Sequence, residues 1–240
     1  MIRILLAVAL CLPGFAQAQD KKKSAEEVWN ELFAKREGKV VPFNRFLADA
    51  VKDRQPGRAL DVGMGQGRNS LFLAALGWQV TGFDISAVGV KQAQAEAARR
   101  GLKIDARVAD VDKFDYGKER WKLVVGMYMH EYLTRNAKKI VDSLQPGGIL
   151  VIEGIHRDIN KAALASGERY GYRTNELPQV FGRLRLLYYE DTVAQADWDR
   201  SGGKPVPLVR MIAIKEAAGG LTVIVPDLVQ SHVRFIQWRN

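Results

Sequence analysis

Apolar and polar residues follow two different periods along the chain, and these predict alternating helices and strands. Apolar stripes and helix-boundary residues predict helices at residues 24–35, 44–53, 68–76, 87–100 and 134–144. Short apolar runs predict strands at residues 58–62, 78–83, 104–109, 123–127 and 149–153. The run at 123–127 is nearly all apolar, which is typical of a strand buried on both faces. Strands that alternate with helices in this way predict a parallel sheet with helices on both of its faces.

The alternation weakens after Gly154. A short helix is predicted at residues 177–181, and two strands at 184–194 and 208–215 are joined by a loop that contains Gly202 and Gly203. Two further strand-like runs, at 221–225 and 233–238, have no predicted place in the sheet.

Residues 1–18 have the pattern of a secretory signal. A positive charge at Arg3 precedes an uncharged apolar run at 4–15, and an A-x-A sequence follows at 16–18. The apolar run is too short for a stable membrane span, which needs about twenty residues. We therefore expect an exported, periplasmic or secreted protein, with a short N-terminal anchor or an artefactual start as the alternatives.

Charge and cysteine content exclude several classes of function. The 36 basic and 27 acidic residues give a net charge of +9 that is spread along the chain, so no nucleic-acid partner is expected. The single cysteine, Cys11, excludes a disulfide framework and a cysteine zinc site. No metal site is expected, because the histidines lack partners at ligand spacing. No later apolar run is long enough to span a membrane, and the sequence gives no oligomeric state.

The stretch ALDVGMGQGRN, at residues 59–69, leads from a predicted strand through three glycines into a predicted helix. Glycines let the backbone bend sharply and let a ligand approach closely, and the start of the helix offers free N–H groups. The glycines stand at positions 63, 65 and 67, whereas the dinucleotide spacing G-x-G-x-x-G requires a glycine at Arg68. The motif predicts a nucleotide site and disfavours a nicotinamide-dependent dehydrogenase.

Three aspartates stand at the carboxyl ends of three successive predicted strands, where open α/β sheets bind their ligands. Asp61 can receive the ammonium group of an amino-acid moiety. Asp84 can accept hydrogen bonds from both ribose hydroxyls, and Asp110 can accept one from an adenine amino group. Each aspartate alone is also compatible with a solvated loop residue, but the three together predict a nucleoside site.

These motifs resemble those of the class I S-adenosylmethionine-dependent methyltransferases over about residues 40–216. ALDVGMGQG matches the first motif, GFD at 82–84 the acidic motif, ADV at 109–111 the adenine motif, and QPGG at 145–148 the turn before the fifth strand. The resemblance implies S-adenosyl-L-methionine as the cofactor. The residues that it implies for cofactor binding are Asp61, Gly63, Gly65, Gly67, Asn69, Asp84, Ile85, Asp110, Val111 and Met127.

The resemblance also implies a fold and, together with the signal pattern, a division of the chain. The expected fold class is α/β, a single-domain, Rossmann-like, doubly wound sheet of seven strands that is mostly parallel, with the last strand antiparallel. The expected segments are the signal at 1–18, an N-terminal helical cap at 19–57, the methyltransferase domain at 58–216, and an extension of unknown role at 217–240.

Two stretches, GRNSLFLAALGWQVTGFDIS at 67–86 and PFNRFL at 42–47, resemble the branch that holds tellurite-resistance and thiopurine or thiol methyltransferases. That branch acts on small molecules, so a small-molecule methyl acceptor is expected. Lys122 departs from the family pattern, which usually has an acid at the start of the fourth strand. The position is mostly structural, so the departure bears on the branch more than on the activity.

The acceptor side is predicted from residues that follow the fourth and fifth strands. His130 and His156 are expected to face each other across the acceptor pocket. His130, oriented by Glu131, would take a proton or lower the pKa of a thiol, while Arg157 would hold an anionic group and Tyr128 would line the pocket. The alternative is that His130 caps the next helix and that His156 lies in a solvated loop.

The resulting hypothesis is methyl transfer by in-line displacement to a small soft nucleophile, which is a thiol, a chalcogenide or an amine. A macromolecular acceptor and a non-catalytic S-adenosylmethionine-binding protein are the alternatives. Export motivates the latter, because the cofactor is made in the cytoplasm. Trp29 and Phe33 of the first predicted helix either cover the cofactor or pack in the core.

Overall fold

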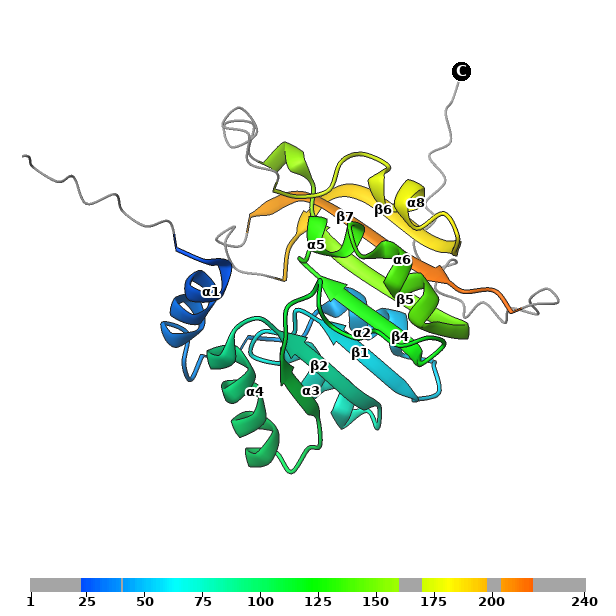
Figure 1. Cartoon of the computed structure of the whole chain (residues 1–240). Helices are drawn as coiled ribbons and strands as arrows, with labels where there is room; N and C mark the ends of the chain where they lie inside the picture. Colours follow the sequence, from blue (N-terminus) through cyan, green and yellow to red (C-terminus); the bar gives the residue numbers. More distant parts are fainter. Residues whose placement is uncertain (1–22, 40, 160–169, 198–203, 218–240) are drawn as a thin grey trace, which may run out of the picture.

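A computed structural model describes residues 23–39, 41–159, 170–197 and 204–217 of the chain. The predicted signal at 1–18, the strand-like runs at 221–225 and 233–238, and nearly all of the predicted C-terminal extension lie outside these residues. The described part is a seven-stranded sheet with helices on both faces (Figure 1). No helix in these ranges combines the length and the apolar character that crossing a membrane requires.

The sheet confirms the predicted fold class. Its strand order is β3-β2-β1-β4-β5-β7-β6, and β7 is the one strand that pairs antiparallel to its neighbours β5 and β6 among the described strands. The strands are β1 Arg58–Val62, β2 Gln79–Asp84, β3 Asp105–Val108, β4 Trp121–Met127, β5 Leu144–Ile155, β6 Arg185–Gln195 and β7 Pro205–Ile214. The reversal of strand order next to β1 places a crevice at the carboxyl ends of β1 and β4.

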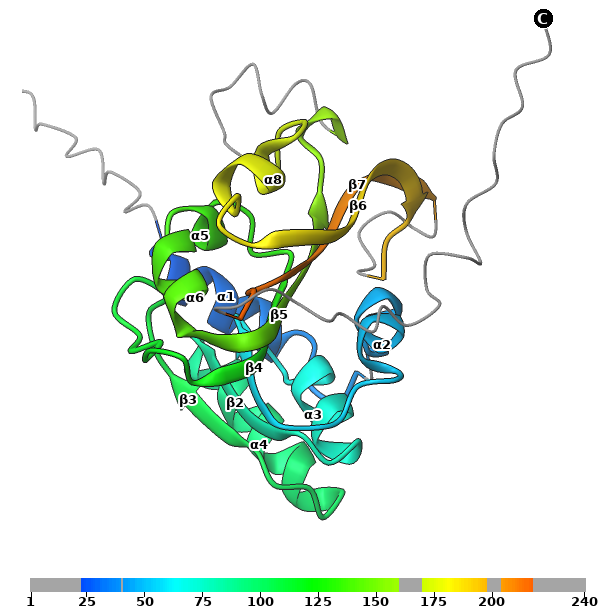
Figure 2. The same ribbon diagram turned by 90° about the vertical axis from the view of Figure 1, so that its right-hand side faces the viewer.

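The helices divide between the two faces of the sheet. Figure 2 shows α2, α3 and α4 on one side and α5, α6 and α8 on the other. The described helices are α1 Ala25–Ala34, α2 Arg45–Val51, α3 Arg68–Ala75, α4 Ala87–Arg99, α5 Glu131–Thr134, α6 Ala137–Ser143, α8 Glu176–Val180 and the 3₁₀ helix η1 Arg157–Ile159. The capping box predicted for the first helix is present, because Ser24 and Glu27 each bond the other's backbone N–H.

Side chains of the central strands alternate between two apolar cores, as the two-residue period of a strand requires. Along β4, Leu123 and Val125 pack with residues of α2 and α3, whereas Val124 packs with residues of α5 and α6. Both faces of β4 are therefore buried. This burial explains why the run at 123–127 is almost entirely apolar and why sequence alone located it.

The elements between residues 131 and 155 differ most from their predicted bounds. The predicted helix at 134–144 is observed mainly as α6, and a separate short helix, α5, precedes it. Between the two, the amide of Asn136 bonds the Tyr132 carbonyl and the Asp112 carboxylate and so competes with helical bonding. Strand β5 begins at Leu144 and includes the predicted turn at 145–148. Lys215 exchanges two backbone bonds with Gly147 and Gly148, which extends the pairing past the turn.

Candidate active site

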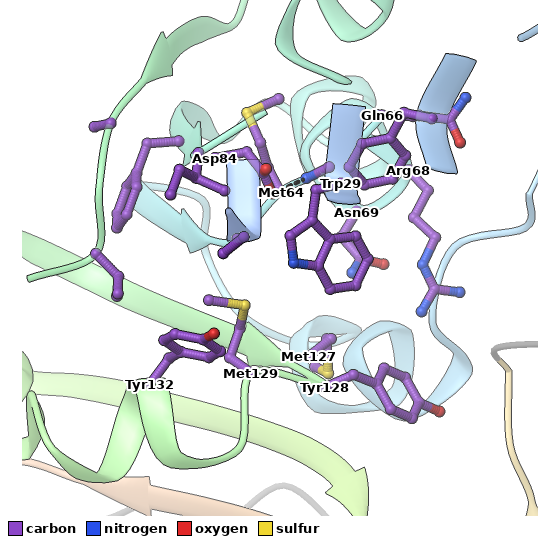
Figure 3. Close-up of a pocket in the computed structure, with 18 of the residues that line it drawn as sticks. Trp29, Met64, Gln66, Arg68, Asn69, Asp84, Met127, Tyr128, Met129 and Tyr132 are labelled. Carbon is purple, nitrogen blue, oxygen red and sulfur yellow. Dashed lines mark hydrogen bonds between the residues drawn. The ribbon is translucent and has the colours of Figure 1, made fainter. Parts of the chain in front are cut away.

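A cavity of about 430 Å³ opens at the carboxyl ends of the central strands. Its walls come from α1, the glycine-rich loop, the ends of β2 and β4, and the loops that follow β3 and β4 (Figure 3). It brings together most of the side chains that the sequence predicts for the cofactor. Those that line it are Gly63, Gly65, Asn69, Asp84, Ile85, Asp110, Val111 and Met127, and the predicted substrate residue Tyr128 lines it as well.

The glycine-rich loop owes its shape to left-handed backbone conformations. Gly63, Gly65 and Gly67 have φ angles of 70°, 53° and 79°. A Cβ on Gly65 would stand 2.9 Å from the ring of Phe33, so the loop passes directly beneath α1. A Cβ on Gly67 would stand 2.8 Å from the Cβ of Ala93 in α4. Gly67 is not among the lining residues and packs against α4, and its predicted contact with the cofactor stays a prediction.

Asp84 joins the glycine-rich loop to the next helix. Its Oδ2 accepts the N–H of Gly65 at 2.9 Å, and its Oδ1 accepts the N–H of Ser86 at 2.8 Å. Burial raises the pKa of Asp84 above its ordinary value, and the bonds from Ser86 and Gly65 oppose that shift. The carboxylate lines the cavity with free acceptor capacity, since an ionised carboxylate has about four lone-pair sites. Asp84 is thus placed to accept ribose hydroxyls, as the sequence predicts.

Asp61 and Asp110 differ in their relation to the cavity. Asp110 lines it, while its Oδ1 accepts the N–H of Asp112 at 2.7 Å. Asp61 is 2% exposed, and its Oδ2 accepts the hydroxyl of Ser70 at 2.7 Å. Burial raises the pKa of Asp61 to about 6. Asp61 turns toward α3 and is not among the lining residues, and its predicted contact with an ammonium group stays a prediction.

The structure contradicts the predicted position of His130. Its ring is buried between Tyr170 and Tyr172, and its Nε2 accepts the N–H of Ile155 at 3.1 Å. Burial lowers the pKa of His130 to about 4, so the imidazole is neutral at pH 7. A φ of 41° at His130 turns the ring away from the cavity and toward the end of β5. The residue stands at the N-cap of α5, but its side chain makes no capping bond.

His156 and Arg157 also lie outside the lining. The Nε2 of His156 is 3.1 Å from the hydroxyl of Thr174, and its Nδ1 accepts the N–H of Asp158 at 3.2 Å. Arg157 donates to the Gly171 carbonyl at 3.1 Å. The two histidines therefore do not face each other across the cavity, and Glu131 does not line it either. His156 is 6% exposed, which also excludes the solvated loop offered as the alternative.

Helix α1 covers the cavity. Trp29 and Phe33 both line it, and their rings stack with centroids 5.7 Å apart. The helix is held against α4 by Asn30, whose Oδ1 accepts the hydroxyl of Ser86 at 2.6 Å and the N–H of Val88 at 3.2 Å. Figure 3 shows the indole of Trp29 lying across the opening, opposite Met129. Of the two sequence alternatives for these aromatic residues, the structure favours a cover.

Sequence reasoning missed a buried carboxylate behind the cavity. Glu153 is 0% exposed and accepts hydrogen bonds from Asn44, Tyr128 and Arg210, each at 2.6 Å. A glutamate inside the otherwise apolar stretch ILVIEGI is the one signal that could have indicated it. Sequence reasoning also passed over the cationic lining residues Arg36, Arg68 and Arg135. The described ranges contain no group of three His, Cys, Asp or Glu side chains arranged to hold a metal ion.

Comparison with known families gives one match. Residues 59–148 match the model of a methyltransferase domain. This range begins inside β1, contains the glycine-rich loop and all three aspartates, and ends at the start of the buried part of β5; helix α1 lies outside it. The match thus covers the residues that form the cofactor side of the cavity.

Two curated relatives of this chain are named as methyltransferases, and a solved structure of one such protein has a similar fold. A probable S-adenosyl-L-methionine-dependent methyltransferase TehB of Haemophilus influenzae is 25% identical over 62% of this chain and 53% of its own length. A ubiquinone biosynthesis O-methyltransferase of Methylobacterium is 32% identical over 44% of each protein. The crystal structure of TehB from Haemophilus influenzae superposes with a TM-score of 0.63 at 21% identity, over 78% of this chain and 67% of that one. The chain spans about half the length of these curated relatives.

The chain therefore resembles the class I S-adenosylmethionine-dependent methyltransferases in sequence and in fold. The relative TehB is named as a probable S-adenosyl-L-methionine-dependent methyltransferase, so S-adenosylmethionine is the group against which the cavity is tested. The cavity fits this group, because it offers glycines without Cβ atoms where the backbone meets a ligand and carboxylates at the ends of β2 and β3. Asp84 would hold the ribose, Asp110 and Val111 would border the adenine, and Asn69 and Met127 would border the amino-acid end.

Proposed function

We propose that this protein, whose residues 59–148 match a methyltransferase domain, transfers a methyl group from S-adenosylmethionine to a small soft nucleophile such as a thiol, a chalcogenide or an amine. The observation that carries the proposal is the composition of the cavity beyond the cofactor residues. That part is lined by the thioether of Met129 and by the ring of Tyr128. Polarizable thioethers and aromatic rings suit a soft, polarizable acceptor.

The bound cofactor supplies an electrophilic methyl group on a sulfonium, and the protein's own residues hold the reactants and exclude water. Asp84 keeps the glycine-rich loop closed against the nucleoside through its bonds to Gly65 and Ser86. Trp29 and Phe33 of α1 cover the cavity and limit the access of water. Holding two reactants in line is the main contribution expected of such a site, since orientation alone can supply a large part of the barrier reduction.

The alternatives fit these features less well. A macromolecular acceptor would have to reach past α1, which is held to α4 by side-chain bonds from Asn30 and Gln92. A non-catalytic binding protein would need only the cofactor side of the cavity. An oxygen acceptor, which the name of the ubiquinone biosynthesis relative states for that protein, is the second candidate that deserves inclusion in a test.

The test is methyl transfer by the full chain from labelled S-adenosylmethionine to a panel of small acceptors. We expect the fastest turnover with mercaptoethanol and thiophenol, slower turnover with primary amines, and none with catechol. The same samples are titrated with S-adenosylhomocysteine by calorimetry. Binding of this product together with turnover of a thiol supports the proposal. Turnover of catechol alone would show that the acceptor atom is oxygen. Binding of S-adenosylhomocysteine without turnover of any acceptor would favour a non-catalytic protein.

Replacing Trp29 by alanine should weaken S-adenosylhomocysteine binding about tenfold, because a large aromatic surface over the ligand is lost. Val28 is on the same helix but is 49% exposed and does not line the cavity. Val28→Ala is therefore the matched control and should change the Kd less than about twofold. Calorimetry measures both values, and equal effects of the two substitutions would mean that α1 does not act as a cover.

A further inference from the structure

The buried carboxylate of Glu153 is tied to the wall of the cavity although it does not line it. It lies on β5 opposite Met127 of β4 and Arg210 of β7. Its Oε2 accepts the guanidinium of Arg210 at 2.6 Å, and Arg210 also donates to Glu190 at 3.0 Å. This cross-strand ion pair compensates the cost of burying the charge. The other carboxylate oxygen, Oε1, is left to bond groups that belong to the site.

Tyr128 is bonded twice to Glu153. Its backbone N–H donates to the Glu153 carbonyl at 2.7 Å, and its hydroxyl donates to the Glu153 Oε1 at 2.6 Å. Its φ of 61° is uncommon for a bulky residue, and such strain persists only where the surroundings enforce it. Figure 3 shows the ring beside Met127 with its hydroxyl directed away from Trp29. The two bonds to Glu153 thus fix which face of the ring the cavity meets.

Asn44 connects Glu153 to the opposite wall of the cavity through hydrogen bonds. Its Nδ2 donates to the Glu153 Oε1 at 2.6 Å, and its backbone N–H donates to the Oδ1 of Asn69 at 2.9 Å. Asn69 is 5% exposed and lines the cavity just after the glycine-rich loop. The orientation of the Asn69 amide is therefore set by Asn44, which is set in turn by Glu153. Two lining residues from distant parts of the chain share one buried anchor.

We propose that Glu153 is a positioning residue for the methyl-transfer end of the cavity: it aims the Tyr128 ring directly, and the Asn69 amide through Asn44, at the space where the acceptor meets the methyl group. This inference rests on the proposed function. Glu153 itself touches neither reactant. Its effect is exerted through Tyr128 and, by way of Asn44, through Asn69, so removing the Tyr128 hydroxyl should add nothing once the carboxylate has been removed.

The first measurement is spectroscopic and needs no acceptor. The full chain is labelled with ¹³C at the tyrosine ζ carbon, and the Tyr128 resonance is assigned by its absence in Tyr128→Phe. We expect S-adenosylhomocysteine to shift this resonance in the wild type and to leave it unshifted in Glu153→Gln. An equal ligand-induced shift of the Tyr128 resonance in Glu153→Gln would overturn the inference.

The second measurement is a double-mutant cycle with the thiol probes. Glu153→Gln and Tyr128→Phe should each lower kcat/KM about tenfold, mainly through kcat, while the Kd of S-adenosylhomocysteine changes less than about twofold. The double variant should fall no further than Glu153→Gln alone. A fall of about a hundredfold in the double variant, the product of two independent effects, would contradict the inference.

Tyr188→Phe is the matched control. The Tyr188 hydroxyl donates to Glu190 at 2.9 Å within the same ion network, but Tyr188 does not line the cavity. Its loss should leave kcat/KM unchanged. If Glu153→Gln does not fold, the kcat/KM values of Tyr128→Phe and Tyr188→Phe are compared instead. Equal losses of kcat/KM in these two variants would refute the positioning role of Glu153. If the wild-type chain binds S-adenosylhomocysteine but methylates no probe, the proposed acceptor class is wrong. The Tyr128 resonance still tests the role of Glu153 in that case.

Discussion

Asp84→Asn should weaken binding of S-adenosylhomocysteine by about a hundredfold or more, the largest effect on binding that we expect of any single substitution in the cavity. Hydrogen bonds that involve a charged group each contribute about 1.5–3 kcal/mol, and two ribose hydroxyls are expected to depend on this carboxylate. The backbone N–H groups of Gly65 and Ser86 each donate to one oxygen of Asp84. In asparagine one of these oxygens becomes an NH₂ group, which cannot accept a hydrogen bond. The glycine-rich loop should therefore lose its closed position as well as its charged acceptor.

Calorimetry on the full chain measures this loss, and circular dichroism confirms that the variant is folded. Asp105→Asn is the matched control, because Asp105 lies on the neighbouring strand β3, bonds Arg107, and is not among the lining residues. Its Kd should stay within about twofold of the wild type. A Kd for Asp84→Asn that matches that of Asp105→Asn would exclude Asp84 as the ribose acceptor.

Asp61→Asn should change how the stability of the protein depends on pH. The pKa of Asp61 is raised to about 6 in the folded protein by burial, compared with about 3.9 in an unfolded chain. The folded state binds this proton more tightly, so the stabilisation is fully present below pH 4 and is lost as the pH rises through 6. A shift of about two pKa units corresponds to about 3 kcal/mol of unfolding free energy. The asparagine variant should lack this decline.

The measurement is urea-induced unfolding of both proteins at several values between pH 4 and 7. The unfolding free energy of the wild type, minus that of Asp61→Asn, should fall by about 3 kcal/mol across this range. Ser70→Ala should change the pH dependence of the unfolding free energy in the opposite direction to Asp61→Asn. The Ser70 hydroxyl donates to Asp61 and holds its pKa down, so its removal should steepen the decline. Parallel pH profiles for the three proteins would show that Asp61 does not titrate in this range.

Local sequence signals predicted most of the fold. The capping box of Ser24 and Glu27 locates the start of α1, and the buried apolar run of 123–127 locates β4. The glycine-rich loop was predictable because its left-handed turns require glycine at positions that are close in sequence. Asp84 was predictable for a related reason, since the carboxyl end of a strand can be read from the strand's own residues. The start of β5 was located less well, because backbone bonds from Gly147 and Gly148 to the distant Lys215 extend the strand through the predicted turn.

The direction of side chains at the acceptor end was not predictable. Placing His130 and His156 after two neighbouring strands was correct, but their orientation depends on backbone angles that the sequence does not mark. Tyr128 and His130 adopt positive φ without being glycine, and this turns one ring into the cavity and the other away from it. Position along a strand therefore predicts which loop a residue joins, but not which way it faces.

The sequence by itself determined the seven-stranded α/β fold and the cofactor side of the cavity, because periodicity, caps and glycine turns act over a few neighbouring residues. Only the tertiary structure decided the other side. Asn44, Glu153 and Arg210 meet because the register of β5 with β7 and the docking of α2 bring them together. The cover formed by α1 likewise depends on bonds from Asn30 to the start of α4. Contacts between residues so far apart follow from the packing of whole elements, which no local pattern records.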